Sequence, residues 1–156
     1  MNRKIKLFTD SASDLPETYR QRFDVGVVPL SVIFGDEEFK DGVDLSLVDF
    51  WKKMAESREL PATNQAAPQD FLDAFGPYVK DGWTILYIGI SAQLSGTIQS
   101  ANLAKELLGT DRIHIFDSKS ASAGESLLVI RAGELLGQGC SLEEVLQQLE
   151  QDRASS

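Results

Sequence analysis

The chain has 156 residues, of which 42% are hydrophobic and 25% charged, and its formal net charge is -9. Length and composition predict one globular domain with a sizeable core. The negative charge argues against a nucleic-acid-binding surface and against attraction to anionic membranes, and no apolar run is long enough to span a bilayer. One cysteine, Cys140, allows no internal disulfide, so a soluble cytoplasmic protein is expected.

Segments rich in β-forming residues predict the strands of a sheet at 5–9, 27–34, 83–90 and 113–116. Pro29 indicates an edge or irregular position within the second of them. Gly35 and Asp36 can turn the chain into a short antiparallel partner at 38–40. The single histidine, His114, falls in the last strand and is expected to be a strand residue rather than a catalyst.

Helical periodicity separates these strands. Helices are expected at 46–56, 68–78, 101–108 and 141–150. The first has a capping pair, Ser46 and Asp49, and an apolar face. That face is formed by Leu47, Phe50, Trp51 and Met54. Strands that alternate with helices predict an α/β fold, a three-layer sandwich in which helices cover both faces of a mainly parallel sheet.

Hydroxyl-rich turns follow three of the expected strands, at 9–14, 91–97 and 117–122. The carboxyl ends of parallel strands lie on one edge of a sheet, and ligands of open α/β sheets bind there. Serine and threonine also cap helices for local reasons, which is the simpler interpretation of any single turn. Three such turns on one edge favour a binding site.

The turn at 91–97 suits an anionic oxygen. Gly96 has no Cβ, so a ligand can approach the backbone, and the first N–H groups of the next helix lie unpaired at its partly positive end. Ser95 and Thr97 add hydroxyl donors. This pattern fits a carboxylate or phosphate oxygen. The alternative is a tight strand–helix joint in which Gly96 serves only for clearance.

Four motifs in this order resemble the DegV family and span nearly the whole chain. They are Thr9-Asp10-Ser11 with Asp14-Leu15-Pro16, Pro61-Ala62-Thr63-Asn64-Gln65, Leu94-Ser95-Gly96-Thr97 with Gln99-Ser100-Ala101, and Asp117-Ser118-Lys119-Ser120 with Gly124. The resemblance implies a fatty-acid-binding subunit of a bacterial two-component fatty acid kinase. In that family an ATP-dependent kinase subunit phosphorylates the bound carboxylate, and the acyl phosphate feeds phospholipid synthesis.

The resemblance also implies site residues. The family's carboxylate-binding threonine falls on Thr63, its partner serine on Ser95, and Gly96 lies behind them. Possible lining residues are Asp10, Ser11, Ser91, Thr97 and Ser118. One departure is local: the family usually has Ser, Pro and Ser where this chain has Asn64, Ala66 and Ala67. Altered hydrogen bonding around the headgroup is therefore expected.

A second departure is length, because members of the family are nearly twice as long. Residues 1–156 correspond to the family's N-terminal α/β domain, and the second domain is expected to be absent, whether the chain is a fragment or a short form. Since the acyl chain of the family lies between or within the two domains, the remaining domain is expected to expose an apolar patch and to self-associate.

No pattern in the sequence indicates catalysis. There is no His/Cys cluster for a metal, no G-x-S-x-G motif, and no complete phosphate loop. The expectation is a non-catalytic fatty acid carrier with no catalytic residue, metal or cofactor. Two alternatives stay open: a phosphoryl-transfer or phosphometabolite-binding domain that uses the same helix N-terminus, and a structural interaction domain without a ligand.

Overall fold

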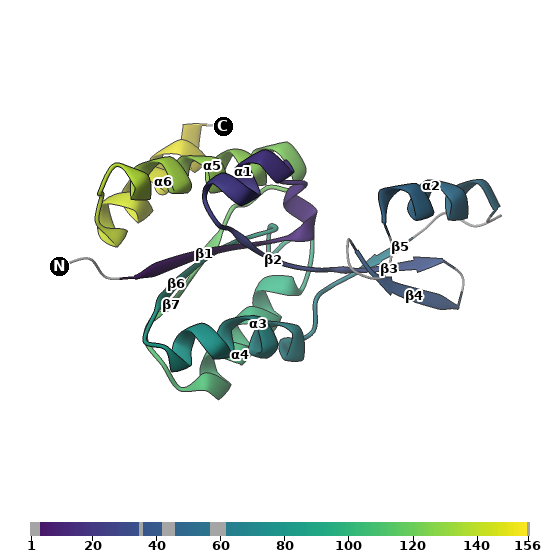
Figure 1. The fold of residues 1–156 in the computed structure, drawn as a ribbon, viewed down its shortest axis with the longest axis horizontal. Helices are drawn as coiled ribbons and strands as arrows, with labels where there is room; N and C mark the ends of the chain where they lie inside the picture. The colour runs from purple at the N-terminus through teal and green to yellow at the C-terminus, as the bar shows by residue number, and fades with distance from the viewer. Residues whose placement is uncertain (1–3, 35, 42–45, 57–61, 156) are drawn as a thin grey trace.

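The computed structural model of the protein describes residues 4–34, 36–41, 46–56 and 62–155. Its main sheet has four parallel strands in the order β2-β1-β6-β7 (Figure 1). The bounds are β1 Ile5–Asp10, β2 Gly26–Val28, β6 Thr84–Gly89 and β7 Ile113–Asp117. Three of the expected strands are confirmed to within one residue at either end, and the mainly parallel sheet is confirmed.

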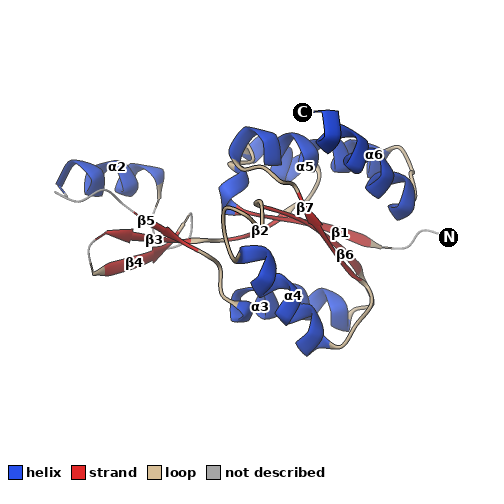
Figure 2. Cartoon of the chain, turned by 180° about the vertical axis from the view of Figure 1, so that it is seen from behind, coloured by secondary structure: helices blue, strands red, loops and turns tan. Residues whose placement is uncertain are grey.

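Helices cover both faces of this sheet, so the three-layer sandwich is confirmed (Figures 1 and 2). One layer holds α3 (Pro68–Lys80) and α4 (Thr97–Leu108); the other holds α1 (Glu17–Arg22), α5 (Ser122–Gly137) and α6 (Leu142–Ser155). Because both faces are covered, the central strand β6 is apolar at successive positions rather than at alternate ones. Ile85 and Tyr87 face α3 and α4, while Leu86 and Ile88 face α5 and α6.

A second, antiparallel sheet has the order β4-β3-β5. Its strands are β3 (Ser31–Phe34), β4 (Glu37–Lys40) and β5 (Ala62–Asn64), and Figure 2 shows it projecting from the main body under helix α2 (Leu47–Glu56). The predicted antiparallel partner of β3 is confirmed. The prediction of one strand over 27–34 is wrong, since β2 ends at Val28 and β3 pairs elsewhere. Pro29, which has no N–H to donate to a ladder, stands at the break.

The expected helices are confirmed, with one error in the apolar face of α2. Phe50 and Met54 pack against the second sheet, but Trp51 is 59% exposed and does not. The side chain of Leu47 lies outside the described part of the chain. Ser46 caps α2 as expected, since its Oγ accepts a hydrogen bond from the Asp49 N–H at 3.1 Å.

Helices α1 and α5 and strand β5 were not expected from the sequence. Helix α5 lies between the sheet and α6 and has apolar neighbours on two sides. Its apolar residues therefore do not form a single stripe, and the helical period is weak.

Two glycines of α5 provide a matched test of how α1 packs. A Cβ at Gly133 would overlap the ring of Phe23, whereas a Cβ at Gly137 would meet nothing within 4 Å. Gly133→Ala should destabilise the fold by about 1–3 kcal/mol because the ring must shift. Gly137→Ala should stabilise it by up to about 1 kcal/mol, since alanine favours the helix. Urea denaturation measures both, and equal effects would mean that Phe23 does not hold α1 on α5.

Candidate functional site

The edge at the carboxyl ends of β1 and β6 is a topological switch point. From β1 the chain enters a short 3-10 helix, η1 (Ser11–Ser13), and then α1 on one face, whereas from β6 it enters α4 on the other (Figure 1). Crevices at such points are where open α/β sheets bind ligands. The two strand ends are tied together, because the Ile90 N–H donates to Asp10 Oδ2 at 2.9 Å.

The three hydroxyl-rich turns meet at this edge. The Ser118 N–H donates to the carbonyl oxygen of Gly89 at 3.1 Å, and the Ser91 N–H donates to that of Ser120 at 2.9 Å. The predicted lining residues Asp10, Ser91 and Ser118 therefore lie together at the ends of β1, β6 and β7. They are 0%, 5% and 2% exposed, so their side chains form the interior of the turns.

Asp10 is the central acceptor of this edge. Its Oδ2 accepts hydrogen bonds from the Tyr87 hydroxyl at 2.5 Å and from the Ile90 N–H, and its Oδ1 accepts one from the Ala12 N–H at 3.2 Å. Burial, followed by the negative charge of Asp10, raises the pKa of Tyr87 well above its ordinary value. Tyr87 thus stays a neutral donor, and the carboxylate fixes the ends of two neighbouring strands.

A second buried acid reaches this cluster from α5. Glu125 is fully buried, and its Oε2 lies 3.1 Å from Thr9 Oγ1. Burial, and then the charge of Asp10, raise the pKa of Glu125 to about 11. Sequence reasoning missed both Glu125 and Tyr87. An acid in the first turn of a helix usually marks an exposed, dipole-stabilised end. The one signal was that Glu125 stands among small and apolar residues.

The start of α4 carries a hydroxyl donor. Ser95 is half-buried, and its Oγ accepts a hydrogen bond from the Thr97 N–H at 3.2 Å and lies 2.8 Å from Thr97 Oγ1. Buried Thr97 Oγ1 also accepts the Ala66 N–H at 3.3 Å, and either hydroxyl of the Ser95–Thr97 pair can be the donor. Their contact uses one of the two hydroxyl protons, so the other is left for an acceptor outside this pair.

The segment from β5 to α3 lies against this turn. A Cβ at Gly96 would overlap the carboxamide of Gln65, so Gly96 is a point of close approach. Thr63 lies on β5, opposite Val32 of β3, two residues before Gln65. Its side chain is outside the part of the chain that the structure describes. The chain that follows Thr63 therefore passes beside the start of α4 before it enters α3.

Ser11 has a different environment from the other predicted lining residues. Its Oγ accepts a hydrogen bond from the Leu30 N–H at 2.9 Å, in the segment that connects β2 of the main sheet to β3 of the second sheet. It also bonds Asp41, whose pKa is raised by burial. Ser11 thus ties the end of β1 to the second sheet.

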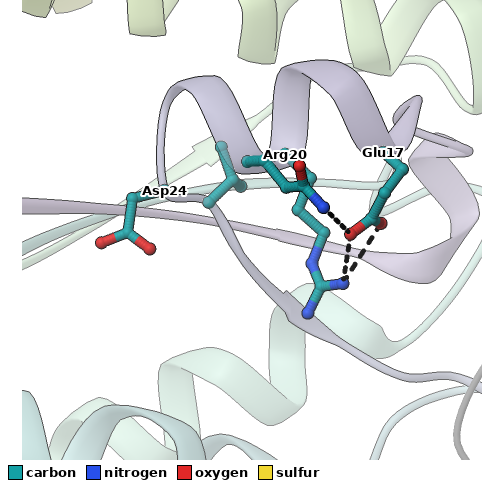
Figure 3. Close-up of a pocket in the computed structure, with 5 residues that line it drawn as sticks. Glu17, Arg20 and Asp24 are labelled. Carbon is teal, nitrogen blue, oxygen red and sulfur yellow. Dashed lines mark hydrogen bonds and ion pairs between the residues drawn. The ribbon is translucent and has the colours of Figure 1, made fainter.

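A hollow of about 230 Å³ lies along α1, lined by Glu17, Arg20, Gln21, Asp24 and Val25 (Figure 3). Its charges have partners: Arg20 Nη1 lies 3.3 Å from both carboxylate oxygens of Glu17, and Asp24 pairs with Lys6 at 3.2 Å. A small polar hollow of this kind does not suit an acyl chain.

Within 4–34, 36–41, 46–56 and 62–155, no cluster of three His, Cys, Asp or Glu side chains is arranged to hold a metal. Over the same ranges, no helix has the length and apolar character needed to cross a membrane. His114 lies on β7, as expected, and its pKa is lowered by partial burial and by the charge of Lys105.

One family of known proteins matches the whole of this architecture. The family described as "Uncharacterised protein, DegV family" matches residues 4–156. A DegV domain-containing protein of Clostridium acetobutylicum is 39% identical over 142 residues, which are 91% of this chain and 51% of that protein. The chain thus spans about half the length of the curated relatives that it matches.

Solved structures of this family superpose closely. A fatty-acid-binding DegV family protein from Thermus thermophilus is 38% identical, with a TM-score of 0.86 over 97% of this chain and 54% of that one. The Streptococcus pneumoniae fatty acid kinase B3 protein, loaded with linoleic acid, is 28% identical, with a TM-score of 0.79 over 97% and 54%. Fold, motifs and matched length together show that this chain belongs to the DegV family.

Proposed function

We propose that the chain binds a long-chain fatty acid and holds its carboxylate at the carboxyl edge of β1 and β6, in contact with Thr63, Ser95 and Gly96. The observation that carries this proposal is the Ser95–Thr97 hydroxyl pair at the start of α4, whose 2.8 Å contact uses only one of its two protons. The first N–H groups and the dipole of α4 favour a negative charge there. The relatives that bind fatty acids support a carboxylate rather than a phosphate.

The same site supports a carrier rather than an enzyme. The described partners of Ser95 Oγ belong to Thr97, and neither is a general base that could activate a serine nucleophile. The S. pneumoniae relative is named as part of a fatty acid kinase. We infer a non-catalytic, cytoplasmic subunit without a cofactor, which presents the carboxylate to an ATP-dependent kinase subunit for acyl-phosphate formation.

The remaining predicted residues support the headgroup site indirectly in this proposal. Four of them form hydrogen bonds with protein atoms and hold the turns in place: Asp10, Ser91, Thr97 and Ser118. Ser11 holds the segment between β2 and β3 through the Leu30 N–H. Ala66 stands where the family usually has proline, and it donates an N–H to Thr97 that a proline lacks. Thr97 Oγ1 therefore has a backbone donor here that a proline at this position would not supply.

Replacing Ser95 by alanine tests the headgroup assignment. We expect fatty acid affinity to fall by about 1 kcal/mol or somewhat more, because a hydroxyl donor to a charged acceptor is lost. Isothermal titration with a labelled or soluble fatty acid measures this change.

Ser141→Ala is the matched control, since Ser141 Oγ accepts the Glu144 N–H at 3.2 Å at the start of α6, as Ser95 Oγ accepts the Thr97 N–H. Both variants should lose about 1 kcal/mol of stability, because each removes a hydroxyl that accepts an N–H at the start of a helix. Only Ser95→Ala should lose affinity, and unchanged binding by that variant would show the headgroup assignment to be wrong.

A further inference from the structure

A buried cluster of Thr9, Asp10, Tyr87 and Glu125 lies beneath the candidate site. All four residues are 0% exposed, and the protonation state of Glu125 decides whether the cluster holds a second buried negative charge beside Asp10. The titratable groups that act on it are acidic: Asp10 at the end of β1 and Asp14 after η1. Tyr87 of β6 interacts with Asp10 and Glu125, and the charge of Asp117 on β7 also raises the pKa of Tyr87.

The hydrogen count at Thr9 places a proton on Glu125. Thr9 Oγ1 lies 2.8 Å from the carbonyl oxygen of Ile88, which can only accept, and 3.1 Å from Glu125 Oε2. A hydroxyl has a single proton, and donating it to Ile88 leaves none for the second contact. A neutral Glu125 removes this conflict, because it can itself donate a proton, to Thr9 Oγ1 or to the hydrogen-bonded Asp10 carboxylate.

The other oxygen of Glu125 leads to the same assignment. Glu125 Oε1 has no hydrogen-bond partner among the described residues. An ionised carboxylate there would be a buried charge without donors, whereas the carbonyl oxygen of a neutral acid costs much less to leave unpaired. Asp10 differs, because it accepts from Tyr87, Ile90 and Ala12. Of two neighbouring carboxyl groups, the one supplied with donors keeps the charge.

We propose that Glu125 is a neutral positioning residue: its acid proton is donated within the cluster of Thr9 and Asp10, so that α5 closes over the Asp10 carboxylate without adding a second buried charge. Asp10 in turn holds the Ile90 N–H and hence the turn that carries Ser95. The positioning role of Glu125 rests on the proposed fatty acid site. The protonation state of Glu125 does not depend on any ligand.

A neutral Glu125 links folding to proton uptake. Its pKa is about 11 in the fold against a model-compound value of 4.5, so the folded protein binds a proton that the unfolded chain has lost. The stability that this group contributes is complete below about pH 4.5 and is lost as the pH rises toward the folded value.

Carbon-13 NMR of the glutamate carboxyl groups in the full chain tests the protonation state, with Glu125→Gln to assign the resonance. The Glu125 signal should stay at the neutral-acid position from about pH 5 to 9. Over that range the unfolding equilibrium constant of the wild type, divided by that of Glu125→Gln, should rise about tenfold per pH unit. A carboxyl that titrates near its ordinary value, with a flat ratio, would overturn the proposal.

Fatty acid titration tests the positioning role. Glu125→Gln keeps shape and a donor, so its affinity should stay within about twofold of the wild type, whereas Glu125→Met should lose about tenfold. Glu134→Gln, an exposed site on the same helix, is the control. Unchanged affinity in a folded Glu125→Met, or lost affinity in a folded Glu125→Gln, would contradict positioning. If the wild type bound no fatty acid, the proposed function would be refuted. The NMR test of the protonation state of Glu125 would still hold, because it needs no ligand.

Discussion

Replacing Asp10 by alanine should destabilise the fold by about 3–5 kcal/mol and remove fatty acid binding, because buried donors left without an acceptor cost about 1–3 kcal/mol each. The Tyr87 hydroxyl and the Ile90 N–H both lose their acceptor in this variant. The ends of β1 and β6 are then no longer tied, and the turn that carries Ser95 loses its anchor. Urea denaturation followed by circular dichroism measures the loss.

Tyr87→Phe is the comparison for this experiment, because it removes one donor and leaves the Ile90 and Ala12 bonds to Asp10 in place. It should cost about 1 kcal/mol, the net value of one hydrogen bond. If Asp10→Ala were no more destabilising than Tyr87→Phe, the carboxylate would not be the anchor of the strand ends.

The second large effect concerns the acyl tail. Each buried methylene contributes about 0.8 kcal/mol, so a sixteen-carbon tail has on the order of 10 kcal/mol at stake. The relatives are about twice as long as the matched region, and we propose that their other half supplies one wall of the tail's site. A form that carries both halves should therefore bind far more tightly than residues 1–156 alone.

The test joins this chain to the second half of the T. thermophilus relative and titrates labelled acids of increasing length. Affinity should rise about tenfold for every two methylenes in the joined form and much less in the chain alone. Light scattering should show that the chain alone self-associates through exposed apolar residues such as Leu94, which is 67% exposed beside Ser95. Equal affinities, with a monomeric short form, would place the whole pocket within these residues.

The sequence predicted the parts of the fold that depend on neighbouring residues. The central strands and the turns after them were found because apolar runs and hydroxyl-rich turns are local signals. The break at Pro29 was not resolved, because it depends on the pairing of β3 with β5, about thirty residues further along the chain. The exposure of Trp51 depends likewise on how α2 packs on the second sheet, which helical periodicity alone does not determine.

The same division applies to the candidate site. Ser95, Gly96 and Thr97 form one local turn and could be singled out from the sequence. The cluster beneath them could not, because Tyr87 meets Asp10 across 77 positions and Glu125 meets Thr9 across 116. Long-range contacts of this kind decide which buried polar groups are paired, and single-residue preferences carry no information about them.

Amide NMR of the isotopically labelled chain, titrated separately with a sixteen-carbon fatty acid and with inorganic phosphate, tests the central claim most directly and detects weak binding. The fatty acid should shift the Ser95, Gly96 and Thr97 signals first, and those of Glu17 and Arg20 beside the α1 hollow should stay in place. Ser95→Ala should reduce the response. Shifts at Ser95 to Thr97 with phosphate and none with the fatty acid would contradict the account and favour a phosphometabolite site.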